Sequence, residues 1–80
     1  MRLDKFLKVS RIIKRRTVAK EFADNDRVMV NGRVARASTE IKKGDIITVQ
    51  AGNKKTVYEV LDIVDNIKAT EAASLYRIIE

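Results

Sequence analysis

The chain has 80 residues and a formal net charge of +6, with 17 Lys or Arg, 11 Asp or Glu, and neither Cys nor His. This length allows one domain with a modest hydrophobic core, so we expect a single domain over residues 1–80. Without Cys and His the chain lacks a disulfide framework, a thiolate metal site and the commonest general base, so we expect no metal, no cofactor and no enzyme activity.

The positive charge is confined to the first half of the sequence. Residues 1–36 contain eleven Lys or Arg and four Asp or Glu, whereas residues 37–80 contain six and seven. A like-charged surface repels itself in the folded state, and a polyanionic partner is the simplest reason to keep it. Because the bases cluster instead of mixing with acids, we favour a nucleic-acid or membrane partner over a surface that serves only solubility.

The N-terminal segment predicts a short amphipathic helix over about residues 3–9, with Ser10 as its expected end. Its apolar residues recur at helical spacing and form one stripe, made by Leu3, Phe6 and Leu7. Asp4 falls in the first turn, where its carboxylate suits the helix dipole and can orient Arg2 or a neighbouring base. The segment has several charges and no continuous apolar run, which fits neither a signal peptide nor a membrane anchor. We therefore expect a cytoplasmic protein with no membrane partner.

The basic density is highest at residues 14–16, directly before a second predicted helix. Thr17 can cap that helix with its hydroxyl, and the apolar spacing that follows predicts helix from about Val18 to Asp24. Free backbone N–H groups at the helix start, beside three bases, suit phosphate oxygens. Three bases at a helix N-terminus also act against the helix dipole and cost stability. We therefore favour phosphate binding over an ordinary helical pair with solvated bases.

A β-hairpin is predicted next, around the dipeptide Asn31-Gly32. Asn-Gly is the strongest short hairpin signal, because a type I′ turn needs positive φ at both central residues. The flanking segments, residues 27–30 and 33–36, alternate as strands do. Residues 25–26 must turn the chain out of the preceding helix, and both residue types tolerate left-handed backbone. Arg33 lies near the hairpin turn and extends the basic surface.

The second half predicts further strands with little excess charge. Residues 46–50 are rich in β-branched side chains and predict a central strand. Residues 56–60 predict the next strand, in which we expect Val57 and Val60 to share one face, and Tyr58 to be half-buried instead of stacked on a base. The remaining expected elements are a continuation or bulge over residues 61–64, a short helix over 69–74 and a last strand or tail over 75–79.

The order of these segments resembles the S-four (S4) RNA-binding domain, first described in a small-subunit ribosomal protein. The resemblance covers about residues 2–50 and rests on the stretches RLDKFL, SR, RRTVAKEF, RVMVNGRVA and IKKGDIITV. It implies an α+β fold of the alpha-L type, in which two N-terminal helices pack on a small, strongly bent antiparallel sheet. The basic face of the helical pair would then lie on structured RNA. One departure is Asp26, where many members of the family have Gly.

The chain also looks like S4 proteins that consist of this domain alone, the RqcP family of ribosome-associated quality-control factors, which are relatives of the small bacterial heat-shock S4 protein. The supporting stretches are residues 1–24, VNGRVARAS and EAASLYRII. This resemblance implies a bacterial protein that binds large ribosomal subunits carrying a stalled peptidyl-tRNA. Its partners would be large-subunit rRNA, P-site tRNA and a NEMF-family factor that adds alanine tails to the nascent chain. A monomer is the default expectation.

The candidate RNA-binding residues are basic side chains of the first half. Arg is preferred over Lys where a planar fork can hold a phosphate with two bonds, whereas Lys contributes mainly to the electrostatic field. The resemblance implies that Arg2 and Arg16 are the principal contacts. The full set is Arg2, Lys5, Lys8, Arg11, Lys14, Arg15, Arg16, Lys20 and Arg33.

Other interpretations stay open at this stage. A structured-RNA or rRNA-binding factor in ribosome assembly or heat-shock recycling would use the same surface. A DNA-binding helix-turn-helix protein is also compatible with two helices, but Lys20, Glu21 and Asp24 face outward on the second one and suit a major groove poorly. A membrane-surface or protein-interaction module would need a wider apolar stripe than the first helix has.

Overall fold

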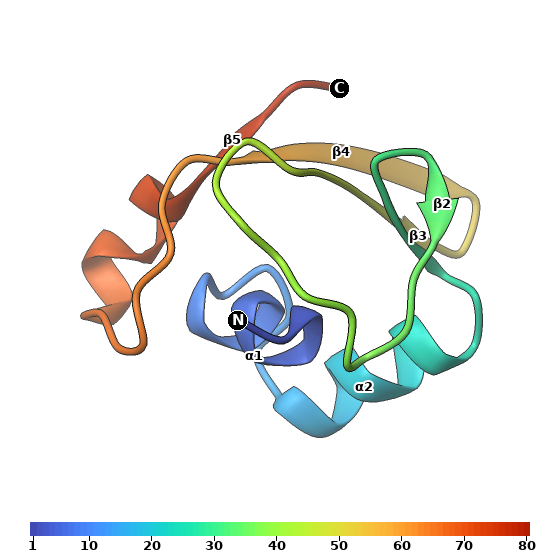
Figure 1. Ribbon diagram of the computed structural model, residues 1–80, viewed down its shortest axis with the longest axis horizontal. Helices are drawn as coiled ribbons and strands as arrows, with labels where there is room; N and C mark the ends of the chain where they lie inside the picture. The colour runs from blue at the N-terminus through green and yellow to red at the C-terminus, as the bar shows by residue number, and fades with distance from the viewer.

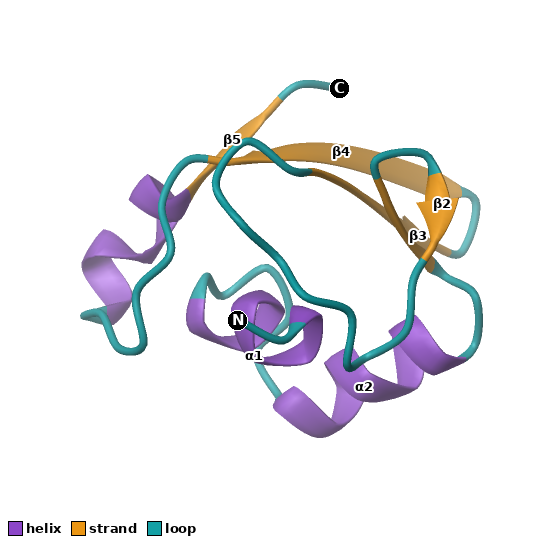
Figure 2. Ribbon diagram, viewed as in Figure 1, coloured by secondary structure: helices purple, strands orange, loops and turns teal.

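A computed structural model describes residues 1–80 as two α-helices, a 3₁₀ helix and one five-stranded antiparallel sheet. In chain order these are α1 (Leu3–Val9), α2 (Arg16–Asp24), β1 (Val28–Val30), β2 (Arg33–Val34), β3 (Ile46–Ala51), β4 (Lys54–Val60), η1 (Ala69–Leu75) and β5 (Tyr76–Ile78). The strand order is β2-β1-β3-β4-β5, so β3 is central, as its β-branched sequence predicts. Both α-helices lie on one side of the curved sheet (Figure 1; Figure 2). The predicted α+β fold is confirmed.

The two α-helices are short, and no helix is long and apolar enough to cross a membrane. α1 has the predicted bounds, and Ser10 is its C-terminal cap residue. α2 begins at Arg16, two residues earlier than predicted, and Thr17 lies inside its first turn. The predicted cap at Thr17 is therefore wrong. The residue that precedes the helix, Arg15, makes no side-chain cap hydrogen bond.

The predicted hairpin is present, with a shorter second strand. Asn31 and Gly32 have φ of 52° and 81°, the positive values that a type I′ turn requires. β1 pairs with β2 only over Met29 and Val30, because the chain leaves the sheet after Val34. Asp26 has φ of 63°, so this Asp adopts the left-handed conformation that Gly adopts more easily.

The link between β2 and β3 fixes the start of α1. In Figure 1 this link, residues 35–45, passes beside the N-terminal end of α1. The amide of Leu3 donates to the carbonyl of Thr39 at 2.8 Å, and the amide of Asp4 donates to the carbonyl of Ala37 at 3.1 Å. The first amides of a helix have no partner within the helix, so these bonds satisfy donors that would otherwise need water. α1 is thus held by polar bonds at one end as well as by its apolar stripe.

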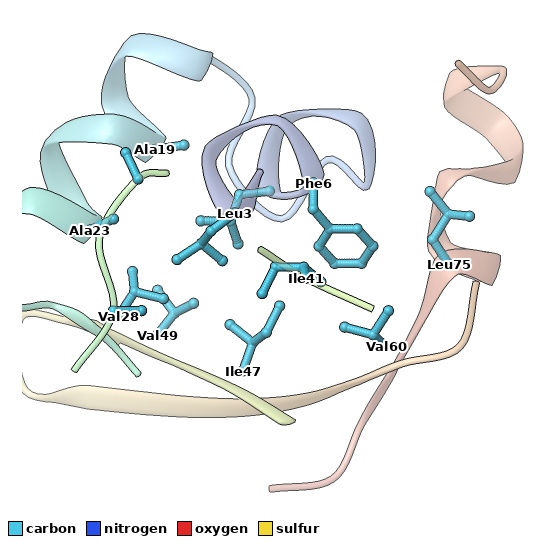
Figure 3. Packing of buried hydrophobic residues seen from close by; sticks show 13 residues of the cluster. Leu3, Phe6, Ala19, Ala23, Val28, Ile41, Ile47, Val49, Val60 and Leu75 are labelled. Atoms are coloured by element: carbon cyan, nitrogen blue, oxygen red, sulfur yellow. The ribbon is translucent and has the colours of Figure 1, made fainter. Parts of the chain in front are cut away.

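The core lies between the helices and the sheet and draws on both halves of the chain. Figure 3 shows the buried side chains of α1, α2, the strands and η1 pointing into one space. The predicted apolar stripe of α1 is fully buried within it. Contributions from beyond the sequence stretch that resembles the S4 domain include Val60 of β4 and Leu75 of η1, each 1% exposed. The C-terminal third is therefore part of the packing around α1.

Two expectations for the second half were wrong. Residues 61–64 form neither a strand nor a bulge, and the chain has no regular structure between β4 and η1. Val57 and Val60 are three residues apart and lie on opposite faces of β4, because strand side chains alternate. The predicted helix and last strand are present as η1 and β5. Tyr58 is half-buried and meets the ring of Tyr76 edge-on, with centroids 5.3 Å apart, so its predicted structural role is confirmed.

The packing of η1 can be tested with Leu75→Ala. We expect this variant to lose about 2–5 kcal/mol of the free energy of unfolding, because it opens a cavity in the core. Ile78→Ala is the control, since that side chain is 60% exposed, and it should change the free energy by less than about 0.5 kcal/mol. Urea denaturation followed by circular dichroism measures both. Equal, small effects would show that η1 does not contribute to the core in solution.

Candidate nucleic-acid interface

One buried carboxylate holds two arginines from different helices. Arg2 directly precedes α1 and Arg16 begins α2. The Nε of Arg2 donates to Oδ1 of Asp4 at 3.2 Å, and the Nε of Arg16 donates to Oδ2 at 3.3 Å. The Asp4 side chain is 3% exposed, whereas those of Arg2 and Arg16 are 49% and 47% exposed. We call these three residues the Asp4 clamp.

Each guanidinium in the clamp also uses one terminal nitrogen. Nη2 of Arg2 donates to Oδ2 of Asp4 at 3.4 Å, and Nη2 of Arg16 donates to Oδ1 at 3.5 Å. The backbone amide of Lys5 adds a bond to Oδ1 at 2.8 Å. The other terminal nitrogen, Nη1, has no protein acceptor on either arginine, and a guanidinium has donors enough for a second partner. Both arginines are therefore fixed in direction and still able to bind an anion.

The clamp keeps Asp4 ionised. Burial raises the pKa of the Asp4 carboxyl, but the hydrogen bonds and positive charges of Arg16 and Arg2 together outweigh burial and hold the pKa below its usual 3.8. At neutral pH the clamp thus contains one negative and two positive charges. Asp4 also places a negative charge beside the first residue of α2, whose first turn contains no acid. Sequence reasoning had identified Asp4 as able to orient Arg2 or another base, and the structure shows that it holds both Arg2 and Arg16.

Most of the other candidate bases are exposed and unpaired. Lys5 is the exception, since its Nζ lies 3.2 Å from Oδ1 of Asp65. Six of the nine candidates make no ion pair: Lys8, Arg11, Lys14, Arg15, Lys20 and Arg33. Unpaired bases can neutralise phosphates without first losing a protein partner.

A pocket of about 220 Å³ brings four candidates together. It lies between α1, the start of α2 and residues 65–67. The candidates that line it are Lys5, Lys8, Arg11 and Arg16. Lys14, Arg15 and Lys20 are exposed near or on α2 without lining the pocket, and Arg33 lies on β2 at an edge of the sheet.

Sequence reasoning missed the pocket residues of the second half. Asp65, Asn66 and Ile67 form one wall of the pocket, about sixty residues beyond Lys5 in the chain. They belong to no helix or strand, so no periodic pattern marks them. Only the fold brings this segment to α1.

The S4 domain is the family whose model matches this chain, over residues 1–47. That range is more than half of the chain and contains the Asp4 clamp and all nine candidate bases. Residues 65–67 lie outside it.

Known proteins extend the similarity to the whole chain. The RQC P-site tRNA stabilizing factor of Bacillus subtilis is 52% identical over 80 residues, which are 100% of this chain and 93% of that protein. The protein of the same name from Streptococcus pneumoniae is 54% identical over 79 residues, covering 99% and 90%. Heat shock protein 15 of Vibrio cholerae, solved as a trimeric structure, has a TM-score of 0.90 at 32% identity and covers 99% of this chain and 81% of that one. By sequence and by structure, this chain belongs to the S4 domain family.

Proposed function

We propose that this protein is a non-catalytic RNA-binding factor of ribosome-associated quality control. In this role it binds the large ribosomal subunit and stabilises P-site tRNA while alanine tails are added to stalled nascent chains. Its partners are large-subunit rRNA, P-site tRNA and a NEMF-family tailing factor in the bacterial cytoplasm. Relatives that are about half identical over 99–100% of this chain, and whose names state P-site tRNA stabilisation, support this assignment.

The Asp4 clamp is the observation that carries the proposal. A phosphate is held best by an arginine fork that offers two parallel N–H donors. Ordering a long side chain on binding usually costs about 0.5–1.5 kcal/mol, and the clamp reduces that cost because Asp4 already orders both arginines. Two oriented and half-exposed guanidinium groups therefore suit two phosphates of one RNA.

The surrounding bases fit the same target. A-form RNA hides its base edges in a deep, narrow groove, so a small domain binds its phosphates and 2′-hydroxyls more readily than its sequence. In the proposal Arg2 and Arg16 make the principal contacts. The further contacts and the attracting field come from Lys5, Lys8, Arg11, Lys14, Arg15, Lys20 and Arg33. We also propose that the chain acts as a monomer, which size-exclusion chromatography with light scattering checks directly.

A double variant, Arg2→Ala with Arg16→Ala, tests the ribosome assignment. We expect it to bind purified large subunits at least about tenfold more weakly, because two oriented phosphate contacts are lost. Each such contact contributes up to about 3 kcal/mol to the free energy of binding. Sucrose-gradient sedimentation of a lysate, with the large-subunit peak probed for peptidyl-tRNA, should place the wild type with tRNA-bearing large subunits and the variant at the top.

Two matched variants separate geometry from charge and from folding. Lys54→Ala with Lys55→Ala removes the same charge from the exposed β3–β4 hairpin and should sediment with the subunits. Arg2→Lys with Arg16→Lys keeps the charge beside Asp4 but removes the forks, so it should fold normally and still bind weakly. Sedimentation of the wild type away from large subunits would contradict the proposed role, and full binding by the lysine variant would contradict the principal role of the two arginines.

Asp4→Asn tests whether the clamp acts through orientation. Removing an acid from an RNA-binding surface should by itself raise the affinity for RNA, because the net charge increases. We expect the opposite, a fall of at least threefold, since both arginines lose their fixed direction. Glu21→Gln on the exposed face of α2 is the control and should leave the affinity unchanged or raise it. Fluorescence anisotropy with a structured rRNA fragment gives both values, and a rise for Asp4→Asn would contradict the orienting role.

The stability of the fold should depend on pH through the same residue. The folded-state pKa of Asp4 is lowered, so its stabilisation is complete above 3.8 and is lost as the pH falls below 3.8 through the lowered value. We expect Asp4→Asn to be less stable than the wild type by about 1–3 kcal/mol at pH 7. The difference should shrink at acidic pH, where the wild-type carboxyl is protonated. Urea denaturation at several pH values measures it, and a constant difference would show that the charge of Asp4 is not the stabilising feature.

A further inference from the structure

The pocket beside α1 has a composition that the clamp does not explain. Bases line one side of it, whereas Val9 and Ile67 supply apolar surface and Asn66 supplies an amide. We propose that this pocket holds one unpaired nucleotide of the bound RNA, with its phosphate at Lys8 and Arg11 and its base against the apolar pair. This inference rests on the proposed function, because it assumes that RNA lies on the face formed by α1 and α2.

The chemistry of the lining fits a nucleotide better than a bare phosphate. The side chain of Asn66 is exposed and makes no hydrogen bond within the protein, so its amide can both donate to and accept from a base edge. Val9 and Ile67 are half-buried and pack against the core, so the apolar surface they offer is fixed in place. Unpaired nucleotides are the usual targets of sequence-specific RNA recognition, because their base edges are free to form hydrogen bonds with side chains such as an amide.

The size of the pocket limits its occupant. Its volume of about 220 Å³ lies below the roughly 300 Å³ at which pockets for drug-sized ligands begin. One base with its phosphate at the rim fits this space better than a longer stretch of single strand does. The ion pair between Lys5 and Asp65 joins α1 to the opposite wall and defines that side of the pocket.

Arg11 gives an independent indication. It follows the C-terminal cap of α1 and has φ of 65°, a left-handed conformation that usually belongs to Gly at this position. Its backbone amide still closes the helix by donating to the carbonyl of Lys8 at 3.1 Å, a bond that Gly would make without steric cost. A long basic side chain is thus present at a position whose backbone conformation favours glycine. This points to a role for the Arg11 side chain at the pocket rim.

Two hairpin RNAs test the pocket directly. One hairpin is fully paired, and the other carries a single-nucleotide bulge and is made in four versions with A, C, G or U. All share the same stem pairs, and the paired hairpin has one additional nucleotide in its terminal loop, so that the number of phosphates is equal. We expect the wild type to bind at least one bulged hairpin about tenfold more tightly than the paired one. Asn66→Ala should lose this preference while its affinity for the paired hairpin changes less than about threefold. Arg11→Gly should also lose the preference, and it should bind the paired hairpin more weakly as well, because it removes one positive charge from the RNA-binding surface. Asn53→Ala, in the exposed β3–β4 turn, is the control and should keep the preference.

Nuclear magnetic resonance titrations add a test that needs no intact RNA. Nucleoside 5′-monophosphates should shift the side-chain amide signals of Asn66 and the methyl signals of Val9 and Ile67, whereas inorganic phosphate should not shift the methyls. Equal affinity for bulged and paired hairpins, or identical shifts with inorganic phosphate, would overturn the proposal. If large-subunit binding persists with neither preference nor shifts, the pocket inference alone fails. If nucleotides shift these signals but the wild-type protein does not sediment with large ribosomal subunits, the proposed function alone fails.

Discussion

The buried carboxylate of Asp4 is the constraint on which the rest of this surface depends. An ionised acid inside a protein must be paired and hydrogen-bonded, and here both partners are arginines that reach it from outside. The residue belongs to α1, one partner begins α2, and its own amide is bonded to the link before β3. One side chain thus sets the start of α2 against α1. It also ensures that any polyanion approaching this face meets two guanidinium groups of defined direction.

The two halves of the chain contribute differently to folding and to binding. The first half carries the excess of positive charge, and these like charges repel one another. It also contains α1, whose apolar face is fully buried. Residues from β3, β4 and η1, including Ile47, Val60 and Leu75, enclose that face (Figure 3). The nearly neutral second half therefore supplies the apolar burial that keeps a self-repelling basic surface folded. Binding RNA would relieve the repulsion that the core has to overcome.

Local sequence patterns predicted the elements whose conformation depends on neighbouring residues. The spacing of Leu3, Phe6 and Leu7 predicted α1. Asn31-Gly32 predicted the hairpin turn between β1 and β2, because that turn requires positive φ values. The start of α2 was misplaced because Thr17 looked like a cap, whereas a tertiary bond to Asp4 holds Arg16 at the first helical position. Residues 61–64 resemble a strand in composition, but β5 takes the place beside β4, and the amides of Leu61 and Asp62 both turn to the carbonyl of Leu75. The pocket was not predictable at all, since its walls meet only after the chain has folded.

The irregular segment between β4 and η1 has a consequence for how such a protein can diversify. It contributes no strand to the sheet and lies beyond the 47 residues that match the S4 family, yet residues 65–67 face α1 across the pocket. Asn66 in this segment is exposed and makes no hydrogen bond within the protein, so its side chain can be exchanged at little cost to the fold. In the proposed binding mode the helices supply most of the phosphate contacts, and this segment adds the amide of Asn66 and the apolar surface of Ile67 beside the base. In that binding mode, a substitution at Asn66 would change the preferred nucleotide while the two arginines of the Asp4 clamp keep their phosphate contacts.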